Sequence, residues 1–183
     1  KYLFFGFILT FCSSFGQTFF IGIFNPYIRE EISLTNIEFG TIYSSATLLS
    51  SLVLVWIGKK IDEVTLQKFT LFVSISLACT TLFFGTVNSL ITLFVGLFLL
   101  RLFGQGLMCH ISSTSMAKFF NLNRGKALGF SWLGLSLGEG LLPGFIIFLL
   151  STFYWKSIWI GISIFLFFII VPLLLYLIKT ERK

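Results

Sequence analysis

Six long apolar stretches, separated by short polar connectors, organise the 183-residue sequence. An α-helix needs about 20 apolar residues to cross a hydrocarbon layer of about 30 Å, and each stretch meets that length. The pattern predicts an all-α membrane protein, a bundle of six transmembrane helices with little else. We expect one transmembrane domain, residues 1–183, with helices at about 3–25, 37–58, 66–87, 90–116, 124–149 and 157–178.

Local signals explain several of these helix boundaries. Asn25-Pro26 is expected to end the first helix, because proline has no backbone donor. Thr35 and Glu38 have the spacing of a capping box at the start of the second helix. Asn88-Ser89 provides a cap for the fourth.

Composition excludes a water-soluble domain, since 56% of the residues are hydrophobic and 25 are phenylalanine. The formal charge of +6 does not indicate nucleic-acid binding, because the basic residues lie in short connectors. Cys12, Cys79 and Cys109 all lie in apolar segments, without paired spacing or accompanying histidines. We therefore predict no disulfide framework, no metal site and no cofactor.

Basic residues are distributed unequally between the two sides of the predicted bundle. The side with few of them holds Arg29 and Lys156. This bias predicts that both termini are cytoplasmic in a cell membrane, either a plasma membrane or a bacterial inner membrane. Apolar character begins at once after Lys1 without a cleavage-site pattern, so the chain is interpreted as a fragment that keeps its first helix. The basic side holds Lys1, Lys59, Lys60, Lys68, Lys118, Arg124, Lys126, Lys179, Arg182 and Lys183.

Arg101 belongs to neither side. At a rise of about 1.5 Å per residue it lies about 16 Å below the outer surface, and Glu139 of the fifth helix lies about 15 Å below it. A charge at this depth should face protein or a water-filled cavity. Glu139 is the expected ionic partner of Arg101. This pair has two interpretations. Either its sole role is to join the two helices, or one of its members also contacts a ligand or a proton.

Polar stripes on three helices favour a role in binding. Helical spacing places Gln17 near the level of the charges, and Trp132 on the same face as Glu139. Pro143 is expected to kink the fifth helix and to free the carbonyl of residue 139. The sixth helix, with almost no polar residues, should face lipid. The stripes are Arg101, Gln105, Met108, Ser112 and Ser115 on the fourth helix, and Thr10, Ser13 and Gln17 on the first.

Other features have alternative interpretations. His110 is nine residues after Arg101, and so about 180° away on a regular helix; it is either a packing histidine or a protonation site. Gly134 and Gly138 have the spacing that lets helices approach closely. Ser136 lies in a G-x-S-x-G sequence, but the serine-hydrolase elbow needs a strand-to-helix turn and a histidine base, so we predict no enzyme.

These residues resemble the major facilitator superfamily, specifically its amino-terminal six-helix half. Gly58 and Asp62 match the G-x-x-x-D-R-x-G-R loop between helices 2 and 3, although Glu63 replaces a basic residue and Thr65 a glycine. The segment 101–106 is similar to the helix 4 pattern, which implicates Arg101 in coupling or substrate binding. Glycines at 129–144 resemble the helix 5 motif, but Glu139 stands where that motif has proline, so antiport is not inferred.

A narrower resemblance, carried by segments 14–18, 104–110 and 123–129, is to bacterial monocarboxylate-porter-like members. The resemblance implies half of a twelve-helix fold, with the C-terminal six-helix half as missing partner and substrate bound between the halves. It also implies an alternating-access secondary transporter of a small organic anion such as a monocarboxylate, coupled to protons or another ion. Alternatives are a proton-coupled drug or sugar transporter, an intramembrane protease and a non-transporting scaffold.

Overall fold

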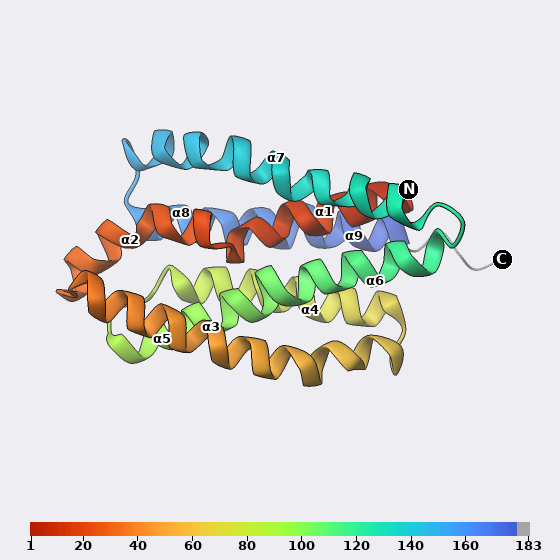
Figure 1. The fold of residues 1–183 in the computed structure, drawn as a ribbon. Helices are drawn as coiled ribbons and strands as arrows, with labels where there is room; N and C mark the ends of the chain where they lie inside the picture. Colours follow the sequence, from red (N-terminus) through yellow and green to blue (C-terminus); the bar gives the residue numbers. More distant parts are fainter. Residues whose placement is uncertain (179–183) are drawn as a thin grey trace.

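The computed structural model describes residues 1–178, and within them it confirms the six-helix membrane architecture. Six helices are long and apolar enough to cross a membrane in this part of the chain. The N-terminus and the end of the last helix lie at the same end of the bundle (Figure 1). We call the helices span 1, Tyr2–Ile32; span 2, Asn36–Asp62; span 3, Leu66–Phe84; span 4, Leu90–Phe119; span 5, Arg124–Leu150; and span 6, Trp155–Ile178.

Short irregular segments interrupt spans 1, 4 and 6, and another ends span 2. Segments η1 and η2 are 3₁₀ turns, and η3 and η4 are π-helical. The elements in chain order are α1 (Tyr2–Ser13), η1 (Ser14–Gly16), α2 (Thr18–Ile32), α3 (Asn36–Gly58), η2 (Lys59–Asp62), α4 (Leu66–Phe84), α5 (Leu90–Leu99), η3 (Leu100–Met108), α6 (Cys109–Phe119), α7 (Arg124–Leu150), α8 (Trp155–Phe165), η4 (Leu166–Ile170) and α9 (Val171–Ile178).

The ends of the first two spans show where local sequence rules hold. The capping box is confirmed, since Thr35 N donates to Glu38 Oε2 at 2.8 Å and Glu38 N to Thr35 Oγ1 at 3.2 Å. The expected end at Pro26 is wrong, because α2 continues to Ile32. Pro26 removes the donor for the carbonyl of Gly22, but both residues are exposed near the end of the span, where that carbonyl can be solvated.

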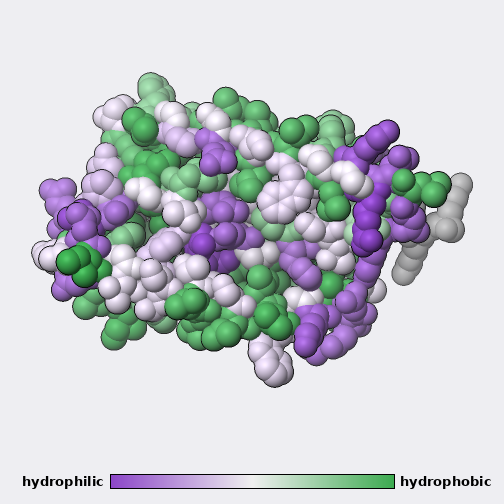
Figure 2. All heavy atoms as spheres, viewed as in Figure 1, coloured by the Kyte–Doolittle hydropathy of each residue, from purple (hydrophilic) through white to green (hydrophobic). Residues whose placement is uncertain are grey.

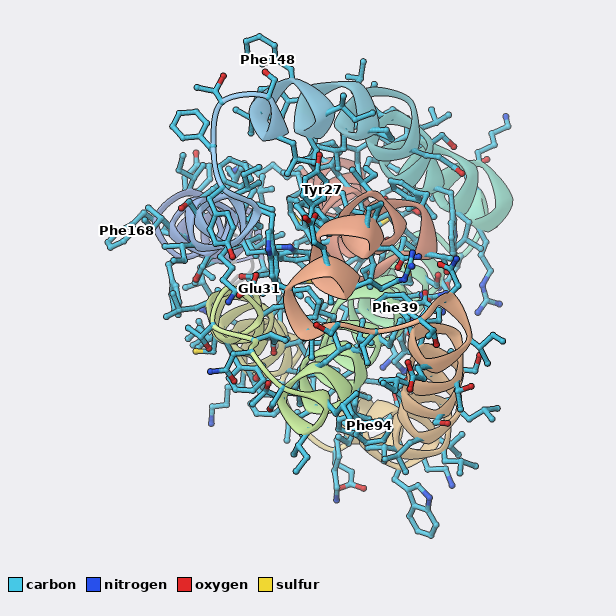
Figure 3. The ribbon with its side chains drawn as sticks, turned by 90° about the vertical axis from the view of Figure 1, so that its left-hand side faces the viewer. Tyr27, Glu31, Phe39, Phe94, Phe148 and Phe168 are labelled. Carbon is cyan, nitrogen blue, oxygen red and sulfur yellow. The ribbon has the colours of Figure 1, made fainter. Side chains whose placement is uncertain are left out.

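Aromatic side chains join spans 1, 3 and 6. Phe20, Phe24, Phe84 and Trp159 are all fully buried, and the ring centroids of Phe84 and Trp159 are 4.6 Å apart. Span 6 therefore presents one face to the core, and its other face points outwards as expected for lipid contact. Phe168, for example, is 76% exposed and points away from the bundle (Figure 3).

Glu31 ties the end of span 1 to the start of span 6. Its Oε2 accepts hydrogen bonds from Tyr154 Oη at 2.5 Å and from Trp155 Nε1 at 2.9 Å, and its Oε1 pairs with Lys156 Nζ. Figure 3 views the bundle from this end. The hydrogen bond to Glu31 raises the pKa of Tyr154 in the connecting loop.

The exterior has the polarity expected of a membrane protein. Figure 2 shows hydrophilic residues at both ends of the bundle, with mostly apolar or neutral residues between them. A smaller hydrophilic patch lies in the middle of the same face. Large apolar side chains such as Trp56 and Phe148 are 75% and 68% exposed, which suits a lipid or helix neighbour rather than water.

Candidate functional site

A break in span 1 lies directly against span 4. After the single turn of η1, Gln17 is extended, with φ −83° and ψ 154°. The helical hydrogen-bond ladder is interrupted here, so the carbonyl of Gly16 can accept a hydrogen bond from another helix. Position 16 requires glycine, because a Cβ would lie 2.2 Å from the carbonyl oxygen of Leu100. Backbone therefore meets backbone at the level of the break.

Span 4 is irregular at the same level. Segment η3 is π-helical, with hydrogen bonds that reach five residues along the chain, a rare geometry that is frequent at functional sites. Gly104 lies in this segment, and a Cβ there would be 2.8 Å from the Cα of Gly16. The same segment carries Arg101 and Gln105. Two irregular helix segments thus position the residues that sequence analysis selected.

Arg101 is held by neutral groups. It is 8% exposed, and its Nη1 donates to the Gly16 carbonyl at 3.1 Å and to Thr18 Oγ1 at 3.3 Å. The guanidinium carbon lies 5.2 Å from the ring centroid of Tyr43, within the range of a cation–π interaction. Nε is buried and has no hydrogen-bond partner among residues 1–178. The guanidinium is therefore positioned by dipoles and a ring rather than by a counter-ion.

Sequence reasoning missed Thr18 and Tyr43. Tyr43 belongs to α3, and its hydroxyl lies 2.8 Å from Thr18 Oγ1, so the two side chains support each other beside Arg101. Neither residue is charged, and Thr18 had been used only as the last residue of segment 14–18 in the narrower resemblance. The available signal was the placement of polar side chains inside apolar spans: Thr18 directly follows Gln17 of the predicted stripe on the first helix, whereas no stripe was predicted on the second helix, which carries Tyr43.

The expected ion pair between Arg101 and Glu139 is not formed. Glu139 is exposed on α7, and within residues 1–178 the ion pairs are Lys60–Glu63, Lys118–Asp62 and Lys156–Glu31. The reason is the position of span 1, which packs against both span 4 and span 5. A Cβ at Gly138 would lie 2.2 Å from Ser14 Oγ, while Gly16 contacts η3. Equal depth in the membrane does not imply contact.

A cavity of about 380 Å³ opens beside Arg101, between spans 2 and 4. Seven of its ten lining residues are polar. Thr47 Oγ1 is buried without a partner, as is Arg101 Nε, so the cavity offers unused hydrogen-bonding capacity in the described chain. The lining residues are Thr47, Ser50, Ser51, Leu54, Arg101, Gln105, Gly106, Cys109, His110 and Ser113.

The predicted polar stripe on span 4 divides in two. Gln105 lines the cavity, but Met108, Ser112 and Ser115 are buried against neighbouring helices. Ser112 Oγ, for example, donates to the Gly6 carbonyl of α1 at 2.9 Å. A regular helix turns by about 100° per residue, and the wider turns of η3 shift every later residue from that phase.

The same shift places His110 in the cavity, although a regular helix would put it opposite Arg101. Its Nε2 lies 3.0 Å from the carbonyl oxygen of Gly58, at the end of α3. A Cβ at Gly58 would lie 3.3 Å from that nitrogen, so the small residue permits the close approach. Asp62, four residues later, pairs with Lys118 of α6 at 2.7 Å. The two loop-motif residues thus join spans 2 and 4.

Span 5 places its predicted residues elsewhere. Trp132 and Glu139 are exposed on α7. Pro143 lies inside this helix, which continues through it to Leu150. A Cβ at Gly134 would lie 2.1 Å from the Phe7 carbonyl oxygen, so this glycine allows span 5 to pack closely on α1. Gln17 is half-buried at the break and does not line the cavity. Of the predicted binding residues, Arg101 and Gln105 share the cavity with His110.

The described residues contain neither a metal-ligand cluster nor a strand-to-helix elbow at Ser136. Within residues 1–178, no group of three or more His, Cys, Asp or Glu side chains is arranged to hold a metal ion. Ser136 lies inside α7, and its hydroxyl donates to the Trp132 carbonyl of the same helix at 3.5 Å. The cavity thus combines a buried cation with polar lining residues, beside a broken helix inside a membrane bundle.

Comparison with protein families decides the class. The profile described as Major Facilitator Superfamily matches residues 6–183. The chain belongs to the major facilitator superfamily. Searches of curated proteins and of solved structures found no match to it. As a superfamily member, the protein is a multi-pass secondary transporter, and its six spans correspond to one six-helix half of the fold. The superfamily transports small molecules rather than catalysing reactions.

Proposed function

We propose that this superfamily member transports a small organic anion, such as a monocarboxylate, with Arg101 as the binding cation. The observation that carries the proposal is a guanidinium that is 8% exposed beside a cavity and forms no ion pair within residues 1–178. A charge inside a membrane protein needs an opposite charge or strong dipoles nearby. A carboxylate substrate supplies that charge and accepts two parallel hydrogen bonds from arginine.

The rest of the cavity fits a small polar ligand. Its volume of about 380 Å³ lies in the range of about 300–1,000 Å³ that is usual for ligand pockets. Thr47, Ser50 and Ser51 place hydroxyls on one wall, and Gln105 places an amide on the other. These groups can bind a hydroxyl or keto substituent of the substrate.

A second six-helix bundle is proposed to complete the site. In an 18-residue apolar stretch of span 2, only 11% of the residues are buried inside the bundle. The corresponding share is 17% in span 5 and 56% in span 1. The two spans therefore keep large faces free for a partner, and Glu139 and Trp132 lie on the free face of span 5. Rocking of the two bundles would expose the cavity alternately to each side, in a cell membrane with both termini of this half cytoplasmic.

Uptake by the full-length protein in lipid vesicles tests the anion site. Arg101→Gln removes the charge, and Arg101→Lys keeps it. We expect the Gln variant to lose uptake of the transported carboxylate by at least about a hundredfold, consistent with the loss of a charge-assisted pair of about 3 kcal/mol. Lys should keep part of the activity. Unchanged uptake of acetate, lactate, oxalate and succinate in Arg101→Gln would remove the binding role.

A second candidate is a proton-coupled drug or sugar transporter in which Glu139 carries the proton. The observation in its favour is that the Glu139 carboxylate has no partner within residues 1–178 and lies at mid-depth in span 5. Substrate-driven proton flux that is lost in Glu139→Gln but kept in Arg101→Gln would select this candidate. The reverse pattern selects the anion site.

A further inference from the structure

His110 stands between two cavities. The first is the cavity of about 380 Å³ that contains Arg101, and the second, of about 270 Å³, lies at the η2 end of span 2. His110 lines both. Of the polar residues around the second cavity, Asp62 and Lys59 belong to η2 and Thr114 to α6. The imidazole can thus exchange a proton with the η2 end while it faces the substrate cavity.

The hydrogen bond to Gly58 fixes one ring nitrogen of His110. A carbonyl oxygen can only accept, so Nε2 is the donor in the 3.0 Å contact. The neutral ring therefore has its free lone pair on Nδ1, which has no hydrogen bond within the described residues. A proton that binds at Nδ1 leaves the bond to Gly58 in place and makes it charge-assisted.

The ionisable groups around the imidazole come from several elements. From its own helix the ionisable groups are Arg101 and Cys109, and from η2 they are Lys59 and Asp62, the latter already paired with Lys118. From α7, Arg124 lines a neighbouring cavity with Lys118. Positive charges outnumber negative ones in this set, and Arg101 is the ionised side chain among the residues that line the first cavity. An anion bound to Arg101 would offset the positive charge that shares this cavity with His110, and would so favour a proton on Nδ1.

We propose that His110 is the binding site of the coupling proton, and that the proton and the anion on Arg101 bind cooperatively. The inference rests on the proposed anion site. One proton from solution converts the neutral imidazole to imidazolium, and one carboxylate neutralises the guanidinium. Binding of the proton and the carboxylate together therefore leaves the net charge of the protein unchanged. Co-transport of a proton with the anion follows from this linkage, since each ligand strengthens the other by the same factor.

The expected coupling follows from the spacing along span 4. Nine residues separate the two side chains, which gives at most about 12–14 Å at the α-helical rise of about 1.5 Å per residue. Two unit charges at that separation, in an effective dielectric of about 20, change an affinity about tenfold. Both carboxylate binding and imidazole protonation should show this factor.

Carboxylate binding to the full-length protein in lipid nanodiscs, at about pH 6 and about pH 8, tests the linkage. Acetate, lactate, oxalate and succinate serve as probes, and we expect about tenfold weaker binding at the higher pH. The matched variant is His110→Gln, because glutamine is neutral and can still donate to Gly58. It should bind a carboxylate equally at both pH values. A pH dependence that survives in this variant overturns the proposal.

A second measurement observes the ring directly. The protein is purified without a polyhistidine tag and labelled with ¹⁵N-histidine, and His110→Gln identifies the signal. At constant near-neutral pH, a saturating carboxylate should move the His110 nitrogens toward the doubly protonated shift. No movement with a carboxylate that binds refutes the proton site. If no carboxylate binds the wild type, or if Arg101→Gln binds equally well, the anion proposal itself fails.

Discussion

The contact between Gly16 and span 4 gives a severe test of the packing. In Gly16→Ala, the new Cβ would lie 2.2 Å from the Leu100 carbonyl oxygen and 2.5 Å from the Gln105 amide nitrogen. Both atoms belong to backbone, so no side-chain rotation can relieve the overlap. Spans 1 and 4 must move apart by about 1 Å, which lengthens the hydrogen bond from Arg101 to the Gly16 carbonyl.

The magnitude combines two effects. Overpacking of a tight interface costs about 1–3 kcal/mol. Weakening a hydrogen bond to a charged group adds up to about 1.5–3 kcal/mol. We expect a loss of about 1–6 kcal/mol in the free energy of unfolding, together with strongly reduced transport, because Arg101 loses its support.

The matched control is Gly22→Ala in the same span, where a Cβ would have no heavy atom within 4 Å. Alanine is the better helix former, so this variant should be as stable as the wild type or more stable by up to about 1 kcal/mol. Unfolding in sodium dodecyl sulfate, followed by circular dichroism, compares the two. If Gly16→Ala and Gly22→Ala differ by less than about 0.5 kcal/mol, the close approach of the two backbones is wrong.

Two further predictions concern contacts outside the cavity. Gly134→Ala places a Cβ 2.1 Å from a carbonyl oxygen of α1, whereas Gly144→Ala meets nothing within 4 Å; the first should destabilise the bundle by about 1–3 kcal/mol in the same unfolding assay and the second should not. Glu31→Gln breaks the ion pair with Lys156 and weakens two further hydrogen bonds, for an expected loss of about 1–2 kcal/mol. Glu30→Gln changes an exposed neighbour with no ion pair in the described chain, and equal effects of the two would contradict the role of Glu31.

The helices themselves could be predicted well because they depend on local chemistry. Apolar length decides whether a helix spans the membrane, and a capping box such as Thr35 with Glu38 decides where one begins. Pro26 was misread because its effect depends on whether the freed carbonyl is solvated, which is a property of its position in the bundle. The break at Gly16 was also missed, since its glycine is explained by a partner helix far away in sequence.

The site was only partly predictable. Arg101 stood out because a charge in an apolar run is costly anywhere in the membrane. Its partners did not, since Thr18 and Tyr43 are ordinary polar residues until the helices are packed. Glu139 was assigned to Arg101 from depth alone, and depth cannot show that span 1 lies between them. His110 was placed on the wrong face because a π-helical segment changes the phase of the helix.

By itself, the sequence determined that this chain is a membrane-embedded helical bundle with one deeply placed arginine, because hydrophobic length and buried charge act residue by residue. The tertiary structure decided which groups hold that arginine, which helices wall the cavity and which histidine faces it. These are distances between residues of different helices, and they follow from packing of the whole bundle rather than from any stretch of the chain.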